Sequence, residues 1–89
     1  MRSGKIRTII RTKEFDNDLA RLIPSIKRAD EFLAGAEIIL ARAPDEGCQL
    51  DHSSVWFVCG HTVDTALYYT FDDNFVYFLS IEKTTLPEL

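Results

Sequence analysis

The two histidines, His52 and His61, lie near the residue types that most often build active or metal sites. Asp64 follows His61 by three positions, and its carboxylate could orient the ring of a histidine acting as a general base. The same histidines combine with the two cysteines as Cys48-x3-His52 and Cys59-x-His61, a set that could ligate zinc. This spacing matches no common structural zinc site, so we expect no metal. A solvated polar turn is the simpler interpretation of His61 and Asp64.

A second group that could bind a ligand is basic. The chain has 89 residues and a formal net charge of −4, yet nine of its ten Lys and Arg lie in residues 1–43. Binding of nucleic acid needs clustered cations, so the acidic second half is not expected to contribute to it. Lys5, Arg7 and Arg11 could form a basic patch that binds an acidic partner. Interleaved acidic residues favour the alternative, a solvated surface whose charges pair with one another.

Composition limits the class of protein. With 46% hydrophobic and 11% aromatic residues, the chain should fold as a single globular domain over residues 1–89. No apolar run approaches the roughly 20 residues that a membrane helix needs, and no apolar segment follows the basic N-terminus. We therefore expect a cytoplasmic protein with no membrane contact. Two cysteines are too few for a disulfide framework, and no phosphate loop or other cofactor motif is present, so no cofactor is expected.

The spacing of apolar residues predicts the helices and strands that must position these side chains. Residues 5–12 alternate and are rich in β-branched side chains, which predicts a strand. Thr12 can cap a short helix whose apolar stripe is Phe15, Leu19 and Leu22, and Pro24 ends it. Residues 25–43 predict a second helix, with Ser25 near its start and apolar positions at 26, 29, 33, 36 and 40.

After the second predicted helix, the apolar residues no longer follow a helical spacing. Residues 54–60, 65–71 and 75–81 are dense in β-branched and aromatic residues, and short polar turns separate them, which predicts an antiparallel meander. The element order is then β-α-α-β-β-β. This predicts an α+β fold, with an antiparallel four-stranded sheet and a helical hairpin packed on one face. The core should join the helices to one face of the sheet through Phe15, Leu19, Leu33, Leu40, Trp56, Leu67, Tyr69 and Phe78.

Pairing of the strands predicts a second apolar face. If 61 pairs with 64 and 72 pairs with 75, then 57 faces 68 and 68 faces 79. Two helices can cover only one face of the sheet, so the other should bind a partner protein or a second copy of the chain. The alternative is that the first strand and residues 84–89 cover it from within. The predicted partner-binding face comprises Val55, Phe57, Cys59, Ala66, Tyr68, Tyr77 and Leu79.

The order of these elements resembles the RelE/ParE toxin family. The similarity includes the basic first strand, the first helix with Phe15, a second helix ending at Pro44 and the Gly-x-x-Leu turn at 47–50. The similarity also includes a Trp-bearing strand, the Ala-Leu-Tyr-Tyr segment at 66–69 and a last strand at 75–81. The resemblance implies a toxin–antitoxin setting, of the plasmid-stabilisation kind, with an antitoxin encoded by a neighbouring gene.

The resemblance also implies two activities, ribosome-dependent mRNA cleavage for RelE-like members and gyrase poisoning for ParE-like members. Phe57 and Cys59 lie where RelE-like enzymes place lysines, and Ala66 lies at the strand arginine. Of the catalytic constellation, only His61 and Lys83 could serve. We therefore expect a toxin-family protein that acts mainly by binding an antitoxin or a target such as gyrase. The alternative is a RelE-like endoribonuclease with a rearranged active site.

Overall fold

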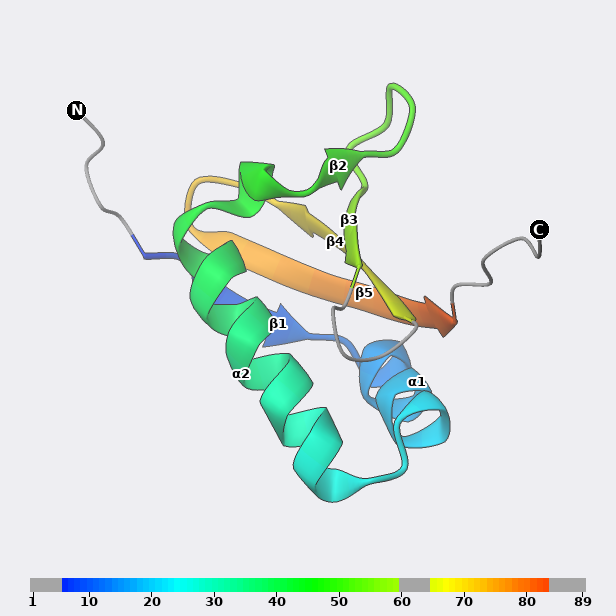
Figure 1. The fold of residues 1–89 in the computed structure, drawn as a ribbon. Coiled ribbons are helices and arrows are strands. Elements are labelled where there is room, and N and C mark those ends of the chain that lie inside the picture. Colours follow the sequence, from blue (N-terminus) through cyan, green and yellow to red (C-terminus); the bar gives the residue numbers. More distant parts are fainter. Residues whose placement is uncertain (1–5, 60–64, 84–89) are drawn as a thin grey trace.

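The computed structural model describes residues 6–59 and 65–83 (Figure 1). Within these residues, two helices and five strands follow one another along the chain, with one 3₁₀ turn after the second helix. Their bounds are β1 (Thr8–Arg11), α1 (Lys13–Leu22), α2 (Ile26–Arg42), η1 (Pro44–Glu46), β2 (Cys48–Gln49), β3 (Trp56–Cys59), β4 (Thr65–Phe71) and β5 (Phe75–Lys83).

Both helices begin at the predicted caps. The Thr12 hydroxyl accepts a hydrogen bond from the Phe15 amide at 3.1 Å, and the Ser25 hydroxyl accepts one from the Arg28 amide at 3.4 Å. Such bonds satisfy amides that have no partner inside the first turn of a helix. The predicted stripe of α1 is confirmed at Phe15 and Leu19, which are buried. Ile26 departs from the predicted stripe of α2, because it begins the helix and is 79% exposed.

The sheet has the strand order β1-β5-β4-β3-β2. The predicted β3–β4 register is confirmed, with Phe57 opposite Tyr68 and Cys59 opposite Ala66. The β4–β5 hairpin also begins as predicted, with Thr70 opposite Tyr77. The register then shifts between Tyr68 and Tyr69, so that Tyr68 faces Ser80 instead of the predicted Leu79.

Contacts from the first helix explain this β-bulge. The Thr12 hydroxyl lies 3.1 Å from the carbonyl oxygens of both Phe78 and Leu79, and the Asp18 carboxylate accepts a bond from the Ile81 amide at 3.3 Å. These side chains satisfy backbone groups at the place where β5 departs from regular pairing. Beyond the bulge Ile81 is turned into the core, where it is 1% exposed.

The prediction of four antiparallel strands was wrong in two respects. A fifth strand, β2, forms where the sequence indicated only a turn, and it pairs with Phe57 and Trp56. The first strand, β1, runs parallel to β5, with Thr8 opposite Phe75. The direction of β1 depends on how the two helices return the chain to the sheet, and the alternation of side chains in residues 5–12 carries no information about that path.

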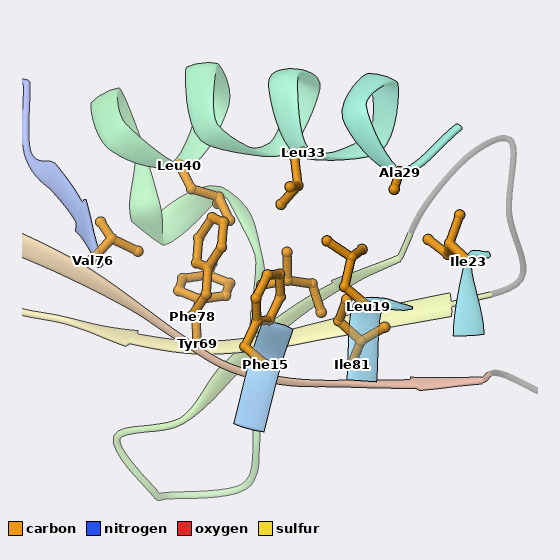
Figure 2. Packing of buried hydrophobic residues seen from close by; sticks show 11 residues of the cluster. Phe15, Leu19, Ile23, Ala29, Leu33, Leu40, Tyr69, Val76, Phe78 and Ile81 are labelled. Carbon is orange, nitrogen blue, oxygen red and sulfur yellow. The ribbon is translucent and has the colours of Figure 1, made fainter. Parts of the chain in front are cut away.

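The core lies between the helices and one face of the sheet (Figure 2). Phe15 and Phe78 pack with ring centroids 5.2 Å apart, and Leu33 and Leu40 of α2 cover the sheet from the other helix. Leu67 and Tyr69 are fully buried and Trp56 is partly buried against the cluster, which confirms the predicted core face. Within the described residues, neither helix has the length and apolarity that crossing a bilayer requires.

Candidate partner-binding site

The side of the sheet that faces away from the helices carries aromatic side chains. We call the residues Ile10, Phe57, Tyr68, Phe75 and Tyr77 the aromatic face, because strand alternation and pairing place them together. Two ring pairs form within it, Phe57 with Tyr68 and Phe75 with Tyr77, each with centroids 5.9 Å apart. Ile10 is 37% exposed and the four rings are half-buried, so apolar surface remains open to a partner.

The structure places the other members of the predicted face differently. Ala66 is only 3% exposed and can offer almost no surface. Leu79 lies at the bulge, has no partner in the strand register and accepts the Thr12 hydroxyl through its carbonyl. Val55 is half-buried just before β3, and Cys59 is exposed at the end of that strand. Phe57, Tyr68 and Tyr77 are thus the predicted residues that the structure gathers into ring pairs.

An acidic group stands at one end of the aromatic face. Asp72 in the β4–β5 turn accepts bonds from the amides of Asn74 and Phe75, each at 2.8 Å, and these bonds lower the pKa of its carboxyl group. The Tyr77 hydroxyl lies 3.4 Å from the same carboxylate. Desolvation, followed by the charge of Asp72, raises the pKa of Tyr77. The pair therefore presents a fixed negative charge beside a neutral phenol.

The predicted cations are not gathered on this face. Arg7 places its guanidinium 5.8 Å from the centre of the Phe71 ring and donates through Nε to the Asp72 carbonyl at 2.7 Å. Arg11 pairs with Asp16 at 3.5 Å. Lys83 is exposed at the far end of β5, opposite Thr65. Arg7 and Arg11 of the predicted basic patch are therefore already engaged with other parts of the chain. The third residue of that patch, Lys5, lies outside the described residues.

The other predicted chemistry concerns the two histidines and the two cysteines. His61, the candidate general base, and Asp64, the carboxylate that could orient it, lie outside the described residues. Cys48 and Cys59 are both free and exposed. Within 6–59 and 65–83, no three His, Cys, Asp or Glu side chains come close enough to hold a metal ion. His52, exposed in the turn between β2 and β3, has no described partner for such a site.

A second apolar surface was not predicted from the sequence. A groove of about 510 Å³ runs between α2 and the edge formed by β2 and β3. Its helical wall includes Phe32, Gly35 and Ile39, and its sheet wall includes Cys48 and Val58. Two signals could have predicted it: a glycine inside a helix, and the consecutive isoleucines 38 and 39, of which only one could face the core. The structure leaves Ile38 62% and Ile39 54% exposed.

Comparison with known proteins places the fold. No family model matches the sequence, and no curated protein matches it. Among solved structures, a chain of the toxin–antitoxin complex RelBE2 from Mycobacterium tuberculosis superposes with a TM-score of 0.70 at 20% identity, covering 88% of this chain and 91% of that one. A chain of the chromosomal ParDE TA system from P. aeruginosa superposes with a TM-score of 0.69 at 11% identity, covering 91% and 99%. The chain therefore has a RelE/ParE-like fold.

Proposed function

We propose that the protein is the toxin-type component of a type II toxin–antitoxin pair and that it acts by binding another protein through the aromatic face. The partner would be an antitoxin from a neighbouring gene or a protein target of the toxin, such as gyrase. The observation that carries the proposal is the pair of ring contacts, Phe57–Tyr68 and Phe75–Tyr77, on the side of the sheet that the helices leave open. Clustered, partly exposed aromatic side chains are typical of protein-binding surfaces.

Charge supports binding of protein rather than cleavage of RNA. The described residues of this side of the sheet include no Lys or Arg, whereas Asp72 and Glu82 lie at its two ends. Cleavage of a phosphodiester needs groups that stabilise negative charge developing at the phosphate. Aromatic rings flanked by carboxylates instead suit an apolar segment that carries basic side chains, which can also stack on the ring faces.

Binding can be tested with the product of the adjacent open reading frame, co-expressed and co-purified with the chain. Wild type should form a stable complex, and Tyr68→Glu should abolish it because a charge would be buried at the centre of the contact. Asp73→Ala is a matched control, since Asp73 is exposed in the turn beyond the face. Light scattering of the isolated chain would show whether the same face pairs two copies when no antitoxin is present. A complex unaffected by Tyr68→Glu would exclude the aromatic face.

The alternative, a RelE-like ribonuclease with a rearranged site, has its own test. Purified protein should fail to cleave mRNA in a ribosome-programmed translation assay. Codon-specific cleavage that disappears in both His61→Ala and Lys83→Ala variants would establish the nuclease and contradict a function by binding alone.

A further inference from the structure

We infer that Asp72, Phe75 and Tyr77 form an anchor site for one arginine side chain of the partner protein. The site lies at one end of the aromatic face, so the inference rests on the function proposed above and adds the side chain that the partner supplies. Phe75 and Tyr77 belong to β5 and form a ring pair with centroids 5.9 Å apart. The Asp72 carboxylate in the preceding turn lies 3.4 Å from the Tyr77 hydroxyl, so charge and ring meet at one place.

The Asp72 carboxylate is held in position by its own turn. Its Oδ1 atom accepts bonds from the amides of Asn74 and Phe75, each at 2.8 Å, which leaves Oδ2 directed at the Tyr77 hydroxyl. The contact of 3.4 Å is longer than the roughly 2.5–3.0 Å of an ordinary O–H···O bond. Oδ2 can therefore accept a stronger donor, and a side chain that is already fixed loses little conformational freedom on binding.

Arg7 lies beside this turn, but its side chain is engaged on the other side of the sheet. It donates through Nε to the backbone carbonyl of Asp72 at 2.7 Å, and its guanidinium lies 5.8 Å from the centre of the Phe71 ring. Phe71 packs against the core, whereas Tyr77 belongs to the aromatic face. Among the described residues, no ion pair involves Asp72. A cation of the partner can therefore approach the carboxylate from the open side of the sheet.

Arginine fits this combination of groups better than other side chains do. Its planar guanidinium can stack on a ring while its edge donates to a carboxylate, and it is more weakly hydrated than the ammonium of lysine. At this site the ring of Tyr77 and the Oδ2 atom of Asp72 are adjacent, so one guanidinium can contact both. An apolar side chain would cover the carboxylate without pairing it, and an acidic one would meet a like charge.

The neighbours of Tyr77 suit the apolar stem of an arginine. The strand register places Ile10 of β1 and Thr70 of β4 on either side of Tyr77. Ile10 is 37% exposed, and a long charged side chain can bury its methylene groups against such a surface while its head remains at the carboxylate. The described part of this side of the sheet carries no Lys or Arg that would repel the bound cation. The surface therefore specifies both the apolar stem and the charged end of the ligand.

The probe is a short blocked peptide that carries one arginine between leucines. Two matched peptides carry citrulline, a neutral isostere of arginine, or lysine at the same position. Amide chemical shifts of the full chain, followed by NMR during titration, should show saturable changes at Asn74, Phe75 and Tyr77 with the arginine peptide. Binding should be about tenfold weaker for the citrulline peptide and about threefold weaker for the lysine peptide. An arginine peptide that binds no better than either matched peptide, or no saturable change at these amides, would overturn the inference.

Substitutions of carboxylates test the charge. Asp72→Asn keeps an oxygen that can accept the two turn amides but removes the charge. It should weaken binding of the arginine peptide about tenfold and leave binding of the citrulline peptide unchanged. Asp73→Asn and Glu82→Gln are matched controls that remove the same charge from exposed positions next to the site and at the far end of the face, and they should bind as wild type does. An equal loss in all three variants would mean a general attraction to an acidic surface and would refute the anchor site.

The ring has its own pair of variants. Tyr77→Leu should weaken binding of the arginine peptide about threefold or more, because it removes the stacking surface, whereas Tyr77→Phe should bind within about twofold of wild type. Circular dichroism checks that each variant remains folded, and the comparison of the arginine and citrulline peptides on wild type decides if one does not. A folded Tyr77→Leu variant with unchanged affinity for the arginine peptide would remove the ring from the site and contradict the inference.

Further results separate this inference from the function proposed above. A complex with the neighbouring gene product that Tyr68→Glu abolishes but Asp72→Asn leaves intact would refute the anchor site and keep the proposed function. Selective binding of the arginine peptide, without any complex with the neighbouring gene product, would do the reverse.

Two other occupants of the site would also be recognised. A dimer in sedimentation that Asp72→Asn dissociates would assign the site to an arginine of a second copy. Binding of the arginine peptide only after removal of residues 1–5 would assign it to the basic N-terminus of the chain itself. Either result would contradict the inference.

Discussion

The Tyr69 hydroxyl donates a hydrogen bond to the carbonyl oxygen of Pro44 and so joins the buried strand β4 to the segment that ends α2. Tyr69 is fully buried, and its phenol is the polar end of an otherwise apolar side chain. A buried carbonyl without a hydrogen-bond partner costs free energy, so this bond stabilises the packing of the start of η1 against the sheet. The adjacent groove takes part of its shape from this contact, because η1 leads into β2.

Tyr69→Phe should therefore lower the free energy of unfolding by about 1–3 kcal/mol, the cost of leaving a buried acceptor unsatisfied. Urea unfolding followed by circular dichroism measures this change. Tyr68→Phe is the matched control, because the neighbouring ring is half-buried and no hydrogen bond from its hydroxyl is found in the described chain. Equal stability of Tyr69→Phe and wild type would show that the bond to Pro44 contributes nothing.

Stability should also fall at high pH because of Tyr69. Burial raises the pKa of Tyr69 to about 12, whereas an unfolded tyrosine titrates near pH 10. The folded state holds the proton more tightly, so the contribution of the neutral phenol is complete below pH ~10 and is lost as the pH rises through about 12. Urea midpoints measured from pH 9 upward should decline in wild type and decline less steeply in Tyr69→Phe. Parallel curves for the two proteins would refute this assignment.

Gly47 and Gly35 should respond in opposite ways to alanine. A Cβ at Gly47 would lie 2.3 Å from the Tyr69 hydroxyl, 2.7 Å from the Phe57 carbonyl oxygen and 2.9 Å from a Val58 methyl group. Overpacking of this kind costs about 1–3 kcal/mol, so Gly47→Ala should lower the thermal midpoint. Gly35→Ala should raise it, since it adds roughly 0.5–1 kcal/mol of helix stability without a clash. A Gly47→Ala variant as stable as wild type would mean that β2 moves freely relative to β3.

Thr12→Ala should destabilise the protein more than Ser25→Ala does. Both hydroxyls cap a helix, and removing such a cap costs typically about 1 kcal/mol. Thr12 also contacts the carbonyls of Phe78 and Leu79 at the β-bulge, 66 and 67 residues away in the sequence. Its loss should therefore cost about 1–2 kcal/mol more. Thr12→Ser, which keeps the hydroxyl, should restore most of the stability, and equal effects of the two alanine variants would remove the special role of Thr12.

Local patterns in the sequence were sufficient for much of the fold. The caps at Thr12 and Ser25, the helix ending before Pro44 and the two hairpin starts depend on neighbours within a few residues. Alternation in β3 and β4 was enough to assign Leu67 and Tyr69 to the core and Phe57 and Tyr68 to the opposite face. Side-chain direction in a strand has a period of two, so a correct turn determines the face of every residue that follows until a bulge intervenes.

The tertiary structure alone decided the bulge, the parallel direction of β1, the fifth strand and the groove. Leu79 changes its place because Thr12 and Asp18 from the first helix bind the backbone around it. The two-residue strand β2 exists only because β3 lies beside it, and the groove exists because α2 and this edge stand apart. Each of these features joins segments that are distant in the chain. Their geometry depends on how the helices pack on the sheet, and short-range spacing does not encode that packing.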